Sequence, residues 1–208
     1  MPKYTVSEIA HIVSGDLIGA TKAVVTSLFF DSRNFADNRN SMFVAIKGER
    51  HNGHDFIFKM YDEGIRSFLI SELRPEYVKL KGASFIAVSN SLEALQAMAA
   101  HHRSKFKIPV VGITGSNGKT IVKEWLSVSL SARYNVVRSP KSFNSQLGVP
   151  LSVWMMNDAN TYAIFEAGIS LPGEMANLEK IIQPTEGIIT NIGEAHQEGF
   201  KNIEKKLK

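Results

Sequence analysis

The spacing of apolar and polar positions divides the chain into two segments. In the first, residues 1–89, Thr5 and Glu8 have the spacing of a capping box ahead of an apolar stretch, which predicts a short helix that ends near Gly15. Short apolar runs bounded by polar residues are typical of strands. The further elements predicted in this segment are a helix over 56–63 and strands over 42–46, 67–70 and 84–88. We therefore expect a small α/β unit.

The second segment, residues 90–208, alternates strands and helices. Its run 108–113 is continuously apolar, as in a parallel strand that is buried on both faces. The predicted strands are 108–113, 135–137, 162–165 and 187–190, and the predicted helical stretches are 92–103, 119–133, 139–156 (a loop and a helix) and 174–182. Repeated strand–helix units with short connections predict a mostly parallel, doubly wound sheet. The alternation stops at Lys208, at the opening of another expected helix.

Composition and charge narrow the class of protein. The chain has no cysteine, which excludes disulfides, thiol catalysis and Cys-based metal sites. The net charge is +4, but four Lys and one Glu within residues 201–208 contribute +3 of it, so no basic face for nucleic acid is indicated. No apolar run approaches the ~18–20 residues of a membrane span, and the N-terminus lacks an apolar signal core. We therefore expect a soluble, cytoplasmic protein.

A glycine-rich loop between a predicted strand and a predicted helix carries the strongest chemical signal. Its sequence, Thr-Gly-Ser-Asn-Gly-Lys-Thr, occupies residues 114–120. Such a loop wraps a phosphate with its backbone N–H groups, while Lys119 can reach the β- and γ-phosphates and the Thr120 hydroxyl can ligate Mg²⁺. The loop departs from the Walker pattern, because Ile113 stands where that pattern has Gly. The candidate nucleotide-binding residues are Gly115, Ser116, Asn117, Gly118, Lys119 and Thr120.

Two residues that follow predicted strands could complete a metal site. Glu166 ends an apolar run just before a glycine turn, where a P-loop site needs its acidic metal ligand, although a simple strand-end residue is the alternative. His196 follows the strand predicted over 187–190, and neutral imidazole is a common metal ligand. The carboxyl ends of strands in open α/β sheets converge on the ligand site. The predicted metal ligands are therefore Thr120, Glu166 and His196, and the predicted catalytic residues are Lys119, Glu166 and His196.

These motifs, in this order, resemble the Mur ligases, the ATP-dependent amide-forming enzymes of peptidoglycan synthesis. The family's Thr-Gly-x-x-Gly-Lys-Thr loop matches residues 114–120, its metal glutamate matches Glu166, and its Asn-Ile-x-x-x-His segment matches residues 191–196. The flanking residues look most like the members that add D-alanyl-D-alanine. The N-terminal segment also resembles the family module that holds the UDP end of the substrate. The substrate-binding residues that this resemblance implies are Ser32, Arg33, Lys47, Asn52, Gly53 and His54, with Asn144 near the phosphates or the substrate carboxylate.

The resemblance also implies a reaction, its cofactors and its partners. UDP-N-acetylmuramoyl-tripeptide would be joined to D-alanyl-D-alanine through an acyl phosphate, with ATP and Mg²⁺ as cofactors. Family members are roughly twice this length and have three domains. Residues 1–89 would then be the UDP-substrate-binding domain, and residues 90–208 an incomplete central domain that lacks its C-terminal partner domain in cis. The family's carbamylated lysine is expected just beyond Lys208, and the fragment alone is expected to be inactive.

Other kinds of protein use the same glycine-rich loop. Another Mur-type ligase or a folylpolyglutamate synthase-like ligase would share the central motifs, but the latter lacks an N-terminal module of the kind seen around His54. A non-catalytic P-loop module would use Lys119 and Thr120 without needing an acid and a histidine at adjoining strand ends. Phosphate release that requires both substrates would separate these possibilities.

Overall fold

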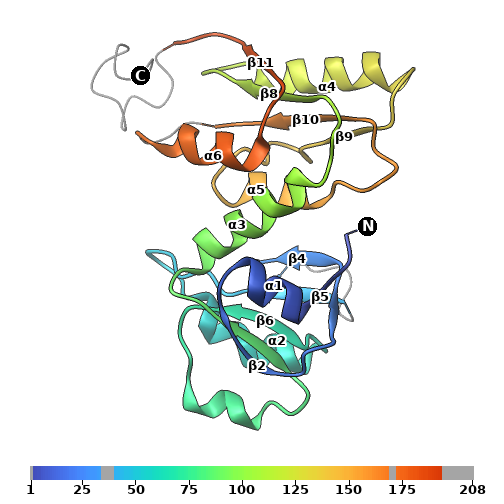
Figure 1. Cartoon of the computed structure of the whole chain (residues 1–208). Helices are drawn as coiled ribbons and strands as arrows, with labels where there is room; N and C mark the ends of the chain where they lie inside the picture. Colours follow the sequence, from blue (N-terminus) through green and yellow to red (C-terminus); the bar gives the residue numbers. More distant parts are fainter. Residues whose placement is uncertain (1, 34–39, 169–171, 194–208) are drawn as a thin grey trace. The chain divides into compact units, whose positions relative to one another are not determined.

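The computed structural model describes residues 2–33, 40–168 and 172–193, and the chain divides into two compact units, residues 1–98 and 99–208 (Figure 1). The division lies within helix α3 (Ser91–Ser104), whereas the predicted boundary lies just before that helix. Each unit has its own sheet and its own hydrophobic core. None of the helices within the described residues is long and apolar enough to cross a membrane.

The first unit is built on a five-stranded sheet with the strand order β2-β7-β6-β5-β4. β2 is antiparallel to β7, and the other neighbouring strands are parallel. Because parallel strands end at the same edge of a sheet, the residues that follow β4, β5 and β6 gather at one edge. The strands are β2 (Asp16–Gly19), β4 (Ser27–Phe29), β5 (Ser41–Val44), β6 (Ser67–Ile70) and β7 (Ser84–Ala87), and β1 (Tyr4–Thr5) pairs separately with β3 (Val24–Val25).

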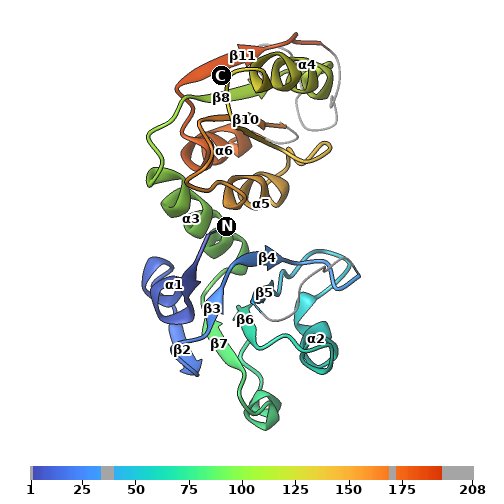
Figure 2. The same ribbon diagram turned by 90° about the vertical axis from the view of Figure 1, so that its right-hand side faces the viewer.

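Helices lie on both sides of this sheet (Figure 2). On one side is α1 (Val6–Ile12), and on the other is α2 (Ile57–Asp62), which the 3-10 helix η1 (Gly53–Phe56) precedes. A second 3-10 helix, η2 (Pro75–Lys79), adds Tyr77 to the core on the α2 side. The predicted capping box is present, because Glu8 N donates to Thr5 Oγ1 at 3.2 Å and Thr5 N donates to Glu8 Oε2 at 2.6 Å.

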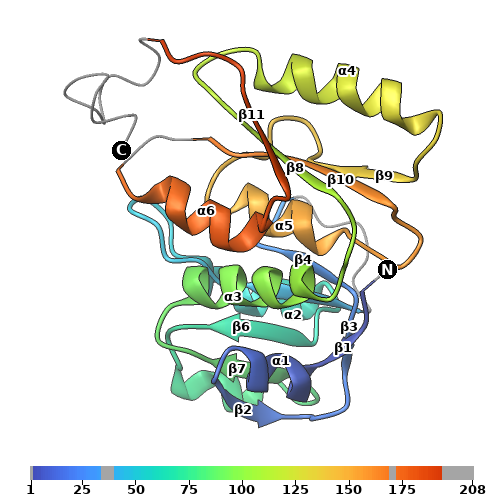
Figure 3. The same cartoon turned by 45° about the horizontal axis from the view of Figure 1, so that its top comes forward.

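The second unit has a four-stranded, wholly parallel sheet with the order β11-β8-β10-β9 (Figure 3). One face carries α4, and the other carries α5 and α6, so the unit has the three layers of a doubly wound fold (Figure 1). Its elements are β8 (Val110–Thr114), α4 (Lys119–Ser131), β9 (Val136–Arg138), α5 (Gly148–Trp154), β10 (Tyr162–Glu166), α6 (Glu174–Ile182) and β11 (Glu186–Ile189).

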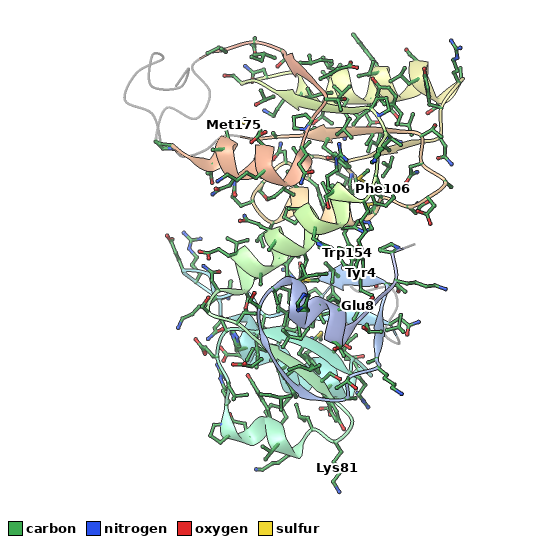
Figure 4. All side chains as sticks on the ribbon, viewed as in Figure 1. Tyr4, Glu8, Lys81, Phe106, Trp154 and Met175 are labelled. Carbon is green, nitrogen blue, oxygen red and sulfur yellow. The ribbon has the colours of Figure 1, made fainter. Side chains whose placement is uncertain are left out.

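The two faces of this sheet have separate cores. Under α4, Ile113 and Ile164 are fully buried and pack with residues of that helix. On the opposite face, Phe165 is fully buried, and the partly buried Phe106 and Met175 pack against the same core (Figure 4). A sheet with apolar residues on both faces explains why its strands appear in the sequence as continuous apolar runs.

The predicted alternation of strands and helices in the second unit is confirmed, including the loop and helix predicted over 139–156. The helix of that stretch is Gly148–Trp154, and side chains hold the residues before it as a loop. The helix predicted over 56–63 begins at Ile57 and follows a 3-10 turn. Strands β1, β2, β3 and β4 were not predicted, since each has only two to four residues.

Candidate active site

The glycine-rich loop joins β8 to α4 and has the shape of a phosphate-binding turn. Gly118 caps α4 in the left-handed conformation with φ 81°, and Gly115 has φ 131°. A Cβ on Gly115 would lie 2.2 Å from Thr190 Oγ1, so a side chain does not fit there. The first N–H groups of α4 have no acceptor within the helix, and the helix dipole favours an anion at this end. Lys119 begins the helix and folds over the loop, because its Nζ donates to Gly115 O at 2.6 Å.

The segment that follows β11 braces this loop. Ser116 N donates to Asn191 O at 2.9 Å, and Asn117 N donates to Asn191 Oδ1 at 2.8 Å. Thr190 Oγ1 donates to Asn117 O at 2.5 Å, and Gly193 N donates to Ser116 Oγ at 2.9 Å. Asn191 is the first residue of the predicted Asn-Ile-x-x-x-His segment, and here its side chain and carbonyl fix the conformation of the loop.

Glu166 ends β10 beside the loop, in register with Ile113 of β8. Its side chain is fully buried, and Thr120 Oγ1 donates to Glu166 Oε2 at 3.1 Å. The other oxygen, Oε1, accepts no aligned hydrogen bond within the described residues, although Lys123 Nζ lies 2.9 Å from it. Mg²⁺ prefers hard oxygen ligands such as carboxylates. Because the Lys123 ammonium faces Oε1, Oε2 and the Thr120 hydroxyl beside it are the pair of oxygens that fits a magnesium site.

Lys123 lies one helical turn after the start of α4, and its side chain is fully buried. Its Nζ is 2.9 Å from Glu166 Oε1 and 3.1 Å from Glu124 Oε1. The same ammonium donates to Ser139 O at 2.9 Å and to Lys141 O. The hydrogen bond from Lys123 is the main reason that the pKa of Glu124 is lowered. A buried cation thus links the candidate metal ligand to the loop after β9.

Asn144 lies beside the end of β10. It belongs to the loop between β9 and α5, and its carbonyl accepts a hydrogen bond from Gly168 N at 2.7 Å. A Cβ on Gly168 would come within 3.0 Å of Asn144 O and Oδ1, so glycine permits the close approach. Because Gly168 closely follows Glu166, a predicted substrate residue and a predicted metal ligand lie at the same edge of the sheet.

In the first unit, a cluster of charged residues gathers around Glu72, which follows β6. Lys47 Nζ donates to Glu72 Oε1 at 2.7 Å, and Asn52 Nδ2 donates to Glu72 Oε2 at 3.1 Å. Arg74 Nη2 lies 3.3 Å from Glu72 Oε2 and 2.8 Å from Asp55 Oδ1. The hydrogen bonds from Lys47, Asn52 and Arg74 lower the pKa of Glu72 to about 2. Two cations and two carboxylates therefore form a network of balanced charge at this edge.

His54 is 1% exposed, and both of its ring nitrogens bond within the unit. Its Nε2 accepts from the backbone N–H groups of Ser71 at 2.9 Å and Glu72 at 3.0 Å, so the ring proton is assigned to Nδ1, 2.7 Å from Asn52 Oδ1. Burial lowers the pKa of His54, which favours this neutral ring. The arrangement leaves neither nitrogen for a ligand, so the ring supports the loop that carries Asn52.

The remaining predicted substrate residues occupy two turns at this edge. Gly53 lies against the end of β5, where an added Cβ would be 2.7 Å from Ile46 N. Ser32 and Arg33 lie in the turn after β4. Arg33 is exposed and forms a two-pronged pair with Asp31, with Nε to Oδ1 at 2.9 Å and Nη2 to Oδ2 at 2.8 Å.

His196 lies outside the described residues, so its predicted place in the metal site stays a prediction. In the part of the chain that the structure describes, no group of three or more His, Cys, Asp or Glu side chains could hold a metal ion. Lys123, Glu72 and Arg74 were not predicted from the sequence. Lys123 lies beside Glu166, Glu72 bonds to Lys47 and Asn52, and Arg74 joins the same cluster through Glu72. For Lys123 no local signal was available, because only the fold shows that Lys123 and Ser127 lie on the buried side of α4, where exposed apolar residues such as Trp125 do not.

Residues 113–208 of the chain match the Mur ligase middle domain. Over 206 residues the chain is 32% identical to a UDP-N-acetylmuramoyl-tripeptide–D-alanyl-D-alanine ligase of Bacillus subtilis (strain 168), a match that covers 98% of this chain and 44% of the relative. The ligase of that name from Borreliella burgdorferi is 37% identical over 188 residues, which are 87% of this chain and 40% of the relative. The chain belongs to the Mur ligase family.

Solved Mur ligase structures share the fold described here. A crystal structure of MurF from Acinetobacter baumannii superimposes with a TM-score of 0.89 and 26% identity, covering 100% of this chain and 45% of that one. The MurF ligase from Thermotoga maritima in complex with ADP gives a TM-score of 0.76 at 30% identity, covering 88% of this chain and 41% of that one. The chain therefore spans less than half the length of the Mur ligases that it matches.

Proposed function

We propose that the protein joins UDP-N-acetylmuramoyl-tripeptide to D-alanyl-D-alanine at the expense of ATP, the activity for which the curated relatives are named. One observation carries the proposal: Thr120 Oγ1 bonds at 3.1 Å to a fully buried glutamate at the end of a neighbouring strand, beneath a glycine-rich loop. This pairing suits a metal-bound nucleotide. The activity is proposed for a protein that also carries the remaining length of those relatives, and we place it in the cytoplasm, where ATP is supplied.

The second unit would bind the nucleotide. Residues 115–120 wrap the phosphates with backbone N–H groups, and Lys119 leaves Gly115 O to reach the β- and γ-phosphates. Thr120 and Glu166 would hold Mg²⁺, with His196 as a further proposed ligand. When bound, Mg²⁺ supplies positive charge to the phosphate oxygens. Lys119 and the helix N-terminus add to that charge where two anions, ATP and a carboxylate, must meet.

We propose that residues 1–89 form the substrate domain and residues 90–208 the nucleotide-binding domain. The substrate domain would hold the UDP end of the substrate. Lys47 and Asn52 are proposed contacts for the uridine diphosphate. In the structure both donate hydrogen bonds to the Glu72 carboxylate. Ser32 and Arg33 would approach from the turn after β4, and Gly53 keeps the neighbouring turn tight. We propose that His54 orients Asn52 rather than touching the ligand.

The proposed chemistry has two steps. A carboxylate oxygen of the tripeptide attacks the γ-phosphorus of ATP, which forms an acyl phosphate and releases ADP. The amine of D-alanyl-D-alanine then attacks the acyl carbon, and phosphate leaves as the amide bond forms and the amine loses a proton. Lys119 would stay with the transferred phosphoryl group, and Asn144 would lie beside the substrate carboxylate, close to Gly168.

The test is a phosphate-release assay on the protein that carries this chain. We expect phosphate only when ATP, Mg²⁺, UDP-N-acetylmuramoyl-tripeptide and D-alanyl-D-alanine are all present. Release with a folate and glutamate instead would favour a folylpolyglutamate synthase-like ligase. ATP binding without phosphate release under any combination of substrates would favour a non-catalytic nucleotide-binding module and would contradict the proposal.

A further inference from the structure

Lys123 is a fully buried cation that lies between the candidate metal ligand and the loop after β9. Four oxygens surround its ammonium: Glu166 Oε1 at 2.9 Å, Glu124 Oε1 at 3.1 Å, Ser139 O at 2.9 Å and the carbonyl of Lys141. The ammonium donates hydrogen bonds to the two carbonyls, and the two carboxylate oxygens lie within ion-pair distance of it. The roles predicted from the sequence do not explain why a lysine stands at this position.

Stability alone is a poor explanation for this cation. Replacing a buried ion pair with apolar residues of similar volume is often neutral or stabilising, because desolvation offsets the attraction between the charges. Lys123 also lies on a helix whose neighbouring side chains, Val122 and Leu126, pack into the apolar core beneath α4. An apolar residue at this position would extend that core, whereas the lysine brings a charge to one particular carboxylate.

The contacts of Lys123 determine what that carboxylate can do. By facing Oε1, the ammonium leaves Oε2 of Glu166 toward the Thr120 hydroxyl, at 3.1 Å. Its hydrogen bonds to Ser139 O and Lys141 O hold the start of the loop that continues to Asn144. The Lys141 backbone is in the left-handed region with φ 48°, a conformation that costs energy for a residue with a side chain.

We propose that Lys123 is a positioning residue, which fixes the Glu166 carboxylate for metal-bound nucleotide and ties this carboxylate to the loop that carries Asn144. The inference rests on the proposed nucleotide site. Glu124 steadies the arrangement from outside, since its Oε2 bonds to Arg138 Nη2 at 3.0 Å at the end of β9. One ammonium therefore couples the metal side of the site to its substrate side.

A chemical rescue separates the charge of Lys123 from its size. Because the chain contains no cysteine, Lys123→Cys introduces a single thiol into it. Alkylation in urea with 2-bromoethylamine, followed by refolding, gives a side chain of lysine length that ends in an ammonium. Alkylation with 1-bromopropane gives a side chain of the same length without charge. Lys123→Met, expressed directly, serves if the modified chains do not refold, and Lys180→Met on the exposed side of α6 is the matched control.

The first readout is the dissociation constant for ADP, measured by calorimetry with Mg²⁺ and with EDTA. We expect the uncharged variants to bind ADP without metal as tightly as the unmodified chain does. The increase in ADP affinity that Mg²⁺ provides should be about 10- to 100-fold smaller in these variants, because a partner that orients a metal ligand has been removed. The aminoethyl side chain should restore the gain, and Lys180→Met should leave it unchanged. A full gain in a folded, uncharged variant would overturn the proposal.

The second readout needs neither metal nor nucleotide. Hydrogen exchange of the amides over residues 139–147 should become faster in the uncharged variants, while exchange in α6 stays the same. Unchanged exchange over 139–147 would overturn the link to the loop. If Mg²⁺ does not raise the ADP affinity of the unmodified chain, the proposed nucleotide site itself is wrong. If Mg²⁺ raises the affinity of the unmodified chain and of all the Lys123 variants alike, only the proposed role of Lys123 is wrong.

Discussion

Single residues of the glycine-rich loop have distinct physical roles. Gly118 needs only the left-handed conformation, since an added Cβ would meet no atom closer than 4.0 Å. Gly115 combines φ 131° with contacts of 2.2 Å to Thr190 Oγ1 and 2.9 Å to Asn191 O that a Cβ would make. The loop is thus tightly fitted against the segment after β11, and its shape depends on Gly115 more than on Gly118.

Substituting Gly115→Ala should therefore disrupt the site. We expect a loss of about 2–5 kcal/mol in the free energy of unfolding, because backbone strain and overpacking add. Gly173→Ala is the matched control, since Gly173 has φ 86° and open space around a Cβ, and about 1–2 kcal/mol of strain is expected there. Urea unfolding followed by the fluorescence of Trp125 and Trp154, both in the second unit, measures the difference. Equal losses in the two variants would contradict the packing of the loop.

The neutral state of His54 makes the first unit sensitive to acid. In the unfolded chain its pKa is near the ordinary 6.5, and burial lowers it in the folded chain. The unfolded state therefore binds the proton more readily. The contribution of neutral His54 to the free energy of unfolding is complete above about pH 6.5, and it is lost as the pH drops toward the lower folded-state pKa.

Substituting His54→Gln should weaken this pH dependence, because the Gln side chain can still accept a hydrogen bond near Ser71 N but does not titrate in this range. The measurement is hydrogen exchange of the β6 amides at pH 7.5 and pH 5.5, corrected for intrinsic rates, in wild type and variant. A wild-type opening free energy that does not fall on acidification, or a variant with the same slope, would show that the ring is not held neutral.

At the scale of elements, a buried arginine closes the C-terminal end of α6. Arg103 of α3 donates from Nε to Ile182 O at 2.8 Å, from Nη2 to Gln183 O at 2.8 Å and from Nη1 to Phe106 O at 2.7 Å. A cation at a helix C-terminus interacts favourably with the helix dipole and with carbonyls that have no partner within the helix. Arg103 thereby fixes where α6 ends before β11 begins.

We expect Arg103→Met to lower the free energy of unfolding of the second unit by about 2–4 kcal/mol, because buried carbonyls lose their donors. Arg103→Lys should recover only part of this, since a single ammonium cannot reproduce the three-carbonyl geometry of the guanidinium. Tryptophan fluorescence during urea unfolding follows both variants. A Lys variant as stable as wild type would show that charge alone matters there.

The elements themselves were predictable to different extents. The central strands of the second unit, β8 and β10, were found because both of their faces are buried, which leaves continuous apolar runs. In the first unit β2 was missed, since three of its four residues are exposed and it pairs with only one neighbour. The candidate site was predicted where local motifs define it, at the glycine-rich loop and Glu166.

Contacts between distant parts of the sequence were not predictable in the same way. In the sequence, Lys123 looks like an ordinary surface residue of a helix. Only the packing of α4 against β10 brings its ammonium to Glu166. The contacts of His54 were not predictable for a similar reason, because the two N–H groups that donate to its Nε2 belong to Ser71 and Glu72, which follow β6. Chemistry set by tertiary structure leaves little trace in local spacing.

In the whole molecule, the two units have separate proposed sites: the first unit would bind the UDP end of the substrate, and the second would bind ATP. The charged cluster around Glu72 lies at the carboxyl edge of the first sheet, and the glycine-rich loop and Glu166 lie at the carboxyl edge of the second. Open α/β sheets bind ligands at such edges. The net charge of +4 lies largely in residues 201–208, so the charge of the rest of the chain is nearly balanced. Ligand binding is therefore expected to depend on local sites rather than on an overall electrostatic field.

The proposed nucleotide site is tested by the affinity of the chain for Mg²⁺-bound ADP, measured by calorimetry. We predict that the wild-type chain binds and that Lys119→Ala weakens the affinity about 10- to 100-fold, because a charged hydrogen-bond donor to phosphate is lost. Lys180→Ala, at an exposed position of α6, should bind like wild type. No binding by the wild-type chain, or equal dissociation constants for wild type and Lys119→Ala, would contradict the assignment of this loop as the nucleotide site.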